Sequence, residues 1–224
     1  MATKITDNYF EFGNQKYFRG NAHLVQPGTY GEKKDPVGPR AYLDPQNKVQ
    51  AEYLASRIQH GTIATVDWSE ADKPTVEVNG LLTFFGLNGK IDANGTYEKV
   101  KNANLRLANL FIAEGPLKAM LNTDADGARK YLADEGRDGR IVSEVWVGME
   151  VALAEHFGTY ASTSWSVKAA GAELQITVTG GKNGAQTITL SSGTAFAFKL
   201  HKVKDWNKDK THIENLEADY PGIG

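Results

Sequence analysis

The sequence predicts an α+β fold, in which a twisted, mainly antiparallel sheet is flanked by a few helices. Three observations predict it: long runs of alternating apolar and polar residues, turn-forming residues between these runs, and two short helical segments before the first run of the second half. That run spans residues 141–153, and its odd positions carry Val145, Val147, Met149, Val151 and Leu153. Its even positions include Glu144 and Glu150, so a strand with one apolar and one polar face is expected. A helix is the alternative, but the β-branched residues and Gly148 disfavour it.

The alternation continues in three further runs, residues 163–169, 174–179 and 187–200. The apolar positions of the first two runs include Trp165, Val167, Ile176 and Val178. A glycine-rich turn at 180–184 separates the last two runs, which predicts an antiparallel hairpin. The second half of the chain is therefore expected to be mostly antiparallel sheet.

The first seventy residues predict shorter elements. Aromatic strands are expected over residues 9–12 and 16–20, around a turn at Gly13-Asn14. Repeated prolines and glycines predict a loop over residues 25–45. Apolar residues at helical spacing predict an amphipathic helix over 46–59, and a strand is expected over 60–69.

The middle of the chain predicts a long hairpin followed by two helices. Residues 76–87 and 96–112 would form the hairpin arms, with Val76, Val78, Leu82, Phe84, Leu105 and Leu107 at apolar positions. A short helix is expected over 114–122, and a second over 125–135 with Asp124 as its N-cap and Gly136 as its stop. The polar tail, about 205–224, is either a strap or a loosely ordered end. One domain, residues 1–224, is expected.

Composition narrows the function classes. Hydrophobic content of 41% and charged content of 23% are ordinary for a globular protein. The net charge of -2 gives no overall attraction to nucleic acid, so we expect no nucleic-acid partner. The chain has no cysteine, which excludes disulfides and thiolate metal sites. We find neither a signal-peptide pattern nor an apolar run of membrane-spanning length, and a cytoplasmic location is expected.

No catalytic constellation emerges from the motifs. The five histidines show no metal-ligand spacing, and Ser191-Ser192-Gly193 does not match a nucleophile elbow. Glu144 and Glu150 share a strand face but lie about 20 Å apart, too far to act as an acid–base pair. We therefore expect no enzyme activity, no cofactor and no metal.

Three segments, in their order along the chain, resemble the pore-forming domain of the gasdermin family. Residues 104–121 are similar to the returning strand of that domain's first hairpin and the short helix after it. Residues 130–145 are similar to the helix, turn and strand that open its second hairpin. Residues 188–200 are similar to its closing strand, and carry the motif residues Ser192, Gly193, Phe196 and Phe198. The resemblance covers roughly residues 75–200.

The resemblance implies a gasdermin-like fold and a protein that binds acidic phospholipid membranes, assembles into a ring and inserts β-hairpins that permeabilise the cell membrane, which causes regulated cell death. The inserting residues would be the apolar positions given above for the two hairpins. Lipid contact is predicted, as a hypothesis, for Lys33, Lys34, Arg40, Lys202 and Lys204. The likeness is greatest to the fungal gasdermin-like cell-death proteins, which implies a homo-oligomer, or a hetero-oligomer with a variant partner chain in allorecognition.

Two alternatives remain open. One is a β-rich module that binds carbohydrate or protein through Trp68, Trp146, Trp165 or Trp206. The other is a small hydrolase whose catalytic residues converge from distant positions. The alternating runs also fit the strands of an ordinary half-buried sheet.

Overall fold

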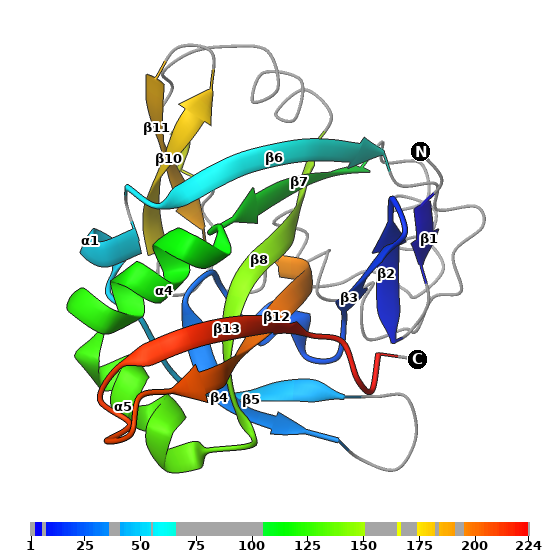
Figure 1. The fold of residues 1–224 in the computed structure, drawn as a ribbon. Helices are drawn as coiled ribbons and strands as arrows, with labels where there is room; N and C mark the ends of the chain where they lie inside the picture. The colour runs from blue at the N-terminus through cyan, green and yellow to red at the C-terminus, as the bar shows by residue number, and fades with distance from the viewer. Residues whose placement is uncertain are drawn as a thin grey trace.

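The computed structural model describes residues 3–5, 8–35, 41–54, 56–65, 105–150, 165–166, 174–181, 184–190 and 195–223. Within them, thirteen strands form one strongly curled sheet, and few helices accompany it (Figure 1). The predicted α+β fold class, with a curled and mainly antiparallel sheet, is confirmed.

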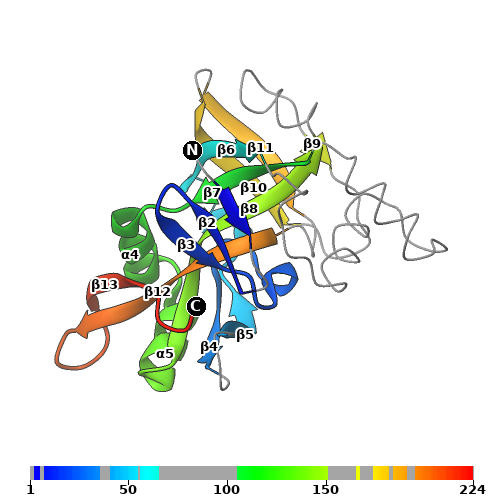
Figure 2. The same ribbon diagram turned by 90° about the vertical axis from the view of Figure 1, so that its right-hand side faces the viewer.

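The strands follow one another in the sheet in an order that interleaves the two halves of the chain. The path runs β1-β2-β3-β12-β8-β7-β6-β10-β11-β9, with β13 paired to β12, β4 paired to β8, and β5 paired to β4. The strands are β1 (Thr3–Ile5), β2 (Tyr9–Phe12), β3 (Gln15–Phe18), β4 (Thr29–Lys34), β5 (Tyr42–Lys48), β6 (Ile58–Thr65), β7 (Leu105–Phe111), β8 (Gly139–Glu150), β9 (Trp165–Ser166), β10 (Leu174–Gly181), β11 (Gly184–Leu190), β12 (Ala195–Trp206) and β13 (Ile213–Asp219). Only the pairs β6–β10 and β9–β11 are parallel among these. Figure 2 shows β9–β11 continuing the sheet beyond β6.

Strand β8 is the centre of the sheet. Along one edge it pairs with β12, from Ala195 opposite Val147 to His201 opposite Ile141. Along the other edge it pairs with β4 near its start and with β7 toward its end. The predicted strand over 141–153 is confirmed as far as Glu150, and the residues after it lie outside the described part.

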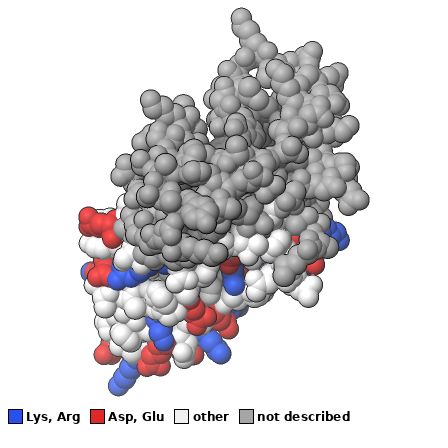
Figure 3. Space-filling view, turned by 90° about the horizontal axis from the view of Figure 1, so that it is seen from above, with Lys and Arg blue, Asp and Glu red and all other residues white. Residues whose placement is uncertain are grey.

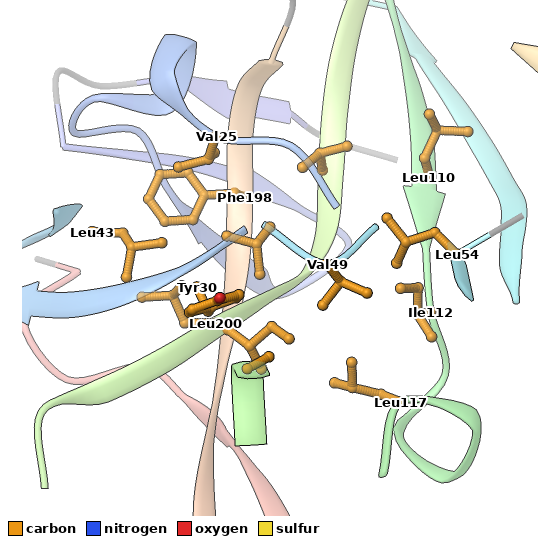
Figure 4. Packing of buried hydrophobic residues seen from close by; sticks show 14 of the residues in the cluster. Val25, Tyr30, Leu43, Val49, Leu54, Leu110, Ile112, Leu117, Phe198 and Leu200 are labelled. Carbon is orange, nitrogen blue, oxygen red and sulfur yellow. The ribbon is translucent and has the colours of Figure 1, made fainter. Parts of the chain in front are cut away.

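The main core lies between the sheet and the helices α4 (Glu114–Thr123) and α5 (Asp126–Glu135). Side chains from β4, β5, β7, β12, α4 and the short helix α1 (Ala51–Leu54) converge there, including Leu43, Leu110, Leu117 and Leu200 (Figure 4). Leu43, Leu117 and Leu200 are 0% exposed, as befits the centre of a close-packed interior.

A second core lies on the opposite face of β8, where the hairpin β2–β3 covers the sheet. Trp146 is 2% exposed and packs against Phe10, with ring centroids 5.1 Å apart, and against Tyr17, at 5.6 Å. The prediction of a polar outer face for this strand is therefore wrong over residues 141–147. Both faces are buried because an element more than a hundred residues earlier in the chain folds over the second one.

Two predicted elements are wrong. Residues 25–45 are not one loop, because β4 and most of β5 lie within them. Pro45 fits β5 because it stands opposite Gly31 at a bulge, where a missing backbone donor is tolerated. The helix over 46–59 is reduced to α1 (Ala51–Leu54), between β5 and β6. The apolar residues of the predicted helix nevertheless lie in the core, where Val49, Leu54 and Ile58 are at most 3% exposed.

Other local predictions are confirmed. The turn at Gly13-Asn14 has φ values of 57° and 69°, the left-handed pair of a two-residue hairpin. Helix α5 ends at Gly136, whose φ is 64°. Asp124, however, is not its N-cap, because Ala125 occupies that position and Asp124 instead accepts a hydrogen bond of 2.5 Å from Arg57 Nη2.

The tail forms an ordered strap in this structure. Strand β13 pairs antiparallel with β12 from Leu200 opposite Asp219 to Trp206 opposite Ile213. Ile213 is 0% exposed and Ile223, near the chain's end, is 5% exposed. Among the described helices, none has the length and apolar character needed to cross a bilayer.

Candidate functional site

Four adjacent strands share one open end of the sheet. The four strands lie in the order β6-β7-β8-β12. Thr65, at the end of β6, pairs with Arg106 of β7, and Leu105, at the start of β7, pairs with Glu150 at the end of β8. Strand β12 begins beside them, with Ala195 opposite Val147. Residues 66–104 connect β6 to β7, and residues 151–194, which include β9–β11, connect β8 to β12. Both connections therefore leave and re-enter the sheet at the same end.

The inserting residues predicted from sequence divide into three groups. Three lie in the cores: Leu107 and Val145 are 0% exposed and Val147 is 2% exposed. Five lie in strands whose side chains at these positions are not described, namely Leu105, Met149, Trp165, Ile176 and Val178. The others lie outside the described residues, namely Val76, Val78, Leu82, Phe84, Val151, Leu153 and Val167.

The register assigns the predicted inserting residues of β7 and β8 to opposite faces. Leu107 pairs with Gly148, so it shares a face with Trp146, and the two belong to the second core. Val145 and Val147 belong to the main core on the other face. In this register, Leu107 and the pair Val145 and Val147 therefore lie on opposite sides of the sheet.

The predicted lipid-contact lysines are mostly paired with carboxylates. Lys33 is 6% exposed and its Nζ lies 2.8 Å from Asp219 Oδ2, so it is not available to a lipid headgroup here and that prediction is corrected. Lys34 pairs with Glu32, and Lys202 Nζ lies 2.8 Å from Glu217 Oε1. Lys204 is exposed, and Arg40 lies outside the described residues. On the face seen in Figure 3, the described basic and acidic side chains are interspersed.

Lys33 belongs to a buried charge cluster that joins β4, β8 and β13. Arg140 Nε also contacts Asp219 Oδ2, at 3.0 Å, and Lys33 Nζ donates to the backbone oxygen of Pro221 at 2.7 Å. Burial alone would raise the pKa of Asp219, but hydrogen bonds and charge from Lys33 and Arg140 outweigh it and lower that pKa. The cluster fastens the tail to the sheet.

The motif phenylalanines described by the structure are core residues. Phe198 is 0% exposed and stacks on Phe18, with centroids 5.7 Å apart. Phe196 is 6% exposed, and the Arg19 guanidinium lies 4.2 Å from the centre of its ring. Ser192 and Gly193 lie outside the described residues.

One cluster has the residue types of a hydrolase. His201 Nδ1 lies 2.8 Å from Ser143 Oγ, and its Nε2 lies 3.8 Å from Glu114 Oε2. Ser143 is only 1% exposed, so a substrate has no access to its hydroxyl oxygen in this structure. Burial, with a smaller effect of Lys199, lowers the pKa of His201 to about 4 and keeps the ring neutral near pH 7. The arrangement gives no support for a hydrolase.

A pocket of about 320 Å³ lies between the hairpin β2–β3 and the face of β6–β8. Its described lining includes four aromatic rings and three polar groups, namely Phe12, Tyr17, Phe111 and Trp146, with Gln15, Asn109 and Glu144. Sequence reasoning missed Tyr17 and Asn109. A signal for Asn109 exists, because it interrupts the apolar face that runs through Leu105 and Leu107.

The tryptophans proposed for a binding module give no exposed aromatic platform in the described part. Trp146 is buried, and Trp206 is half-buried against the main core. Trp68 lies outside the described residues, and the side chain of Trp165 is not described. Among the residues that the structure describes, no group of three histidine or acidic side chains gathers as metal ligands.

Comparison with known proteins finds no match to this chain among family models, curated proteins or solved structures.

Proposed function

We propose that this protein is a gasdermin-like pore-forming protein, which binds acidic membrane lipid, oligomerises and inserts β-hairpins built from residues 66–104 and 151–194. The observation that carries the proposal is the shared open end of β6, β7, β8 and β12. Strands that leave a sheet side by side can be prolonged as one four-stranded ribbon without crossing one another. Each connection is long enough for two strands of about 9–11 residues, the length that spans a bilayer.

The physics of lipid makes assembly a necessary part of this mechanism. A lone four-stranded ribbon in a bilayer would leave unpaired N–H and C=O groups along both edges, each costing several kcal/mol. A ring of protomers removes these edges by pairing each ribbon with the next. The described part of the sheet would stay outside the bilayer, because β7, β8 and β12 each contribute side chains to both cores.

The sequence beyond Glu150 offers a matched pair of variants. Val151 lies on the apolar side of the alternation and Ala152 on the polar side, one residue apart. Val151→Lys would put an ammonium group into lipid, at a cost of about 2–4 kcal/mol per subunit, while Ala152→Lys would face the water-filled lumen. We expect dye release from liposomes rich in anionic lipid to fall at least tenfold for Val151→Lys and to persist for Ala152→Lys.

Two results would count against the proposal. One is retention of dye by anionic liposomes of varied composition in the presence of the wild-type chain. The other is equal release by the two lysine variants. Membrane contact through β12 is tested separately with Lys204→Glu, which should weaken liposome binding, against Lys130→Glu on α5 as an exposed control.

A further inference from the structure

The pocket beneath the hairpin β2–β3 contains an acidic group held in a fixed position. Asn109 Nδ2 donates to Glu144 Oε1 at 2.6 Å, and Asn109 is itself 6% exposed. Gly61 makes room for this amide, because a Cβ there would lie 2.1 Å from Asn109 Oδ1. The carboxylate is thus oriented before any ligand arrives, which lowers the entropic cost of binding.

The other groups around Glu144 leave the pocket with negative charge. Burial, followed by the charge of the nearby Glu144, raises the pKa of Tyr17, so its hydroxyl stays protonated. That hydroxyl donates to Gln15 Oε1 at 3.0 Å. Among the described lining residues there is no lysine, arginine or histidine to balance Glu144. Lys199 stands opposite Glu144 in the β8–β12 pairing, but its Nζ lies over the Tyr220 ring, 5.8 Å from the ring centroid, and it does not line the pocket. A cation would therefore be favoured over an anion.

Aromatic rings form much of the remaining wall. Phe12 and Trp146 lie with their ring centroids 4.9 Å apart, and Tyr17 and Trp146 at 5.6 Å, while Phe111 lines the pocket from β7. Ring faces attract organic cations and also accept their apolar methyl or methylene groups. Bare metal ions gain less from such a wall, because they require several oxygen ligands.

We propose that this pocket binds a small organic ammonium ion. Glu144 neutralises the ammonium group, and the rings surround its carbon substituents. A volume of about 320 Å³ suits a small molecule of this kind. An amino alcohol has this chemistry both as a free molecule and as the headgroup of a phospholipid.

The test uses choline chloride and its neutral carbon isostere, 3,3-dimethylbutan-1-ol, titrated into the full chain by calorimetry. We expect the isostere to bind at least tenfold more weakly than choline, because it lacks the charge that Glu144 attracts. Glu144→Gln should weaken choline binding by at least tenfold, and Glu214→Gln on the exposed side of β13 should leave it unchanged. Equal affinity for choline and the isostere, or no loss in Glu144→Gln, would overturn the proposal.

A second variant tests the aromatic wall separately from the carboxylate. Phe111→Leu keeps an apolar side chain on β7 but removes a ring face, so it should weaken the binding of choline and of tetramethylammonium several-fold. Unchanged binding of both cations would mean that the ring does not contact the ligand, and would overturn that part of the assignment. Competition between choline and phosphatidylcholine vesicles then indicates a lipid headgroup, and its absence indicates a free amino alcohol. Tight binding of a neutral sugar in place of choline would refute the proposal.

Discussion

Asp219→Asn is the change that most directly tests how the tail is fastened to the sheet. The carboxylate is 2% exposed and lies within 3.0 Å of both Lys33 Nζ and Arg140 Nε. Asparagine keeps the size of the side chain and one acceptor oxygen but removes the negative charge. Two buried cations would then remain with no carboxylate between them, since Asp35, 3.6 Å from Lys33, is largely exposed.

The size of the effect follows from the burial of all three partners. Removing one member of a buried ion pair typically costs about 3–5 kcal/mol, mainly because the other charge is left without compensation. We therefore expect Asp219→Asn to lower the free energy of unfolding by about 3 kcal/mol or more. Lys33→Met should cost less, about 1–2 kcal/mol, because Arg140 still neutralises Asp219.

Urea unfolding at pH 7, followed by tryptophan fluorescence, measures both changes from the shift in midpoint. In the double variant, Lys33 is no longer buried without a partner, so the combined loss should be smaller than the sum by about 1–3 kcal/mol. Asp209→Asn, in the exposed turn before β13, is the matched control and should change stability by less than about 0.5 kcal/mol. If Asp219→Asn behaves like this control, the buried cluster does not hold the strap.

The pH dependence of the same cluster has a definite sign. The pKa of Asp219 is lowered below 3.8 by folding, so its contribution is present above that value and is lost as pH falls below it. Asp219→Asn should lack this loss. Urea midpoints between pH 5 and 2.5, wild type against variant, measure the difference, and parallel curves would contradict it.

Three other outcomes are expected from single sites. The pKa of His201 is 6.5 in the unfolded chain and about 4 in the folded protein, so its neutral form contributes stability above pH 6.5 that is lost as pH falls toward 4. In urea titrations over this pH window, the wild type should lose about 3 kcal/mol more of its free energy of unfolding than His201→Gln does. Gly31→Ala should lower the thermal midpoint strongly, because its Cβ would lie 2.0 Å from the backbone oxygen of Asp44. Gly115→Ala on α4, where a Cβ meets nothing within 4 Å, should raise stability by about 0.4–1 kcal/mol, and equal effects at the two glycines would contradict the packing argument.

The elements predicted well are those whose sequence signals are local. Helices α4 and α5 follow from apolar spacing with a stop at Gly136, and the hairpin β2–β3 follows from Gly13-Asn14, because turn and cap residues act within a few positions. The strand β8 follows from alternation over many residues. These signals determine the local backbone conformation, but they do not determine which elements pack or pair with one another.

The predictions that fail depend on contacts between distant segments. Alternation along β8 showed which residues share a face, but not that Phe10 and Tyr17 would cover the second face. In the same way, Val49, Leu54 and Ile58 have helical spacing, yet only Leu54 lies in a helix, because β4 holds β5 beside it and β6 begins at Ile58. Lys33 looked like a loop cation because its partner Asp219 lies at the other end of the chain. The pocket was missed for the same reason, since four separated segments build it.

The pairing of β7 with β8 sets a requirement for any inserted state. Leu105 stands opposite Glu150 in the present register, so an extended β7 would present its leucines on the side where β8 presents its glutamates. A ribbon with one lipid-facing side therefore needs a one-residue shift, or a bulge, between these two strands on insertion.

This requirement is testable because the chain has no cysteine of its own. A disulfide between Leu105→Cys and Glu150→Cys would lock the present register, and we expect it to block dye release until it is reduced. A disulfide between Glu32→Cys and Asp44→Cys, which are paired in β4 and β5 away from the open end, should leave release unchanged. If the locked β7–β8 protein releases dye as readily as the reduced one, the strands keep their register in the membrane, and Leu105 and Leu107 do not share a lipid face with Val151.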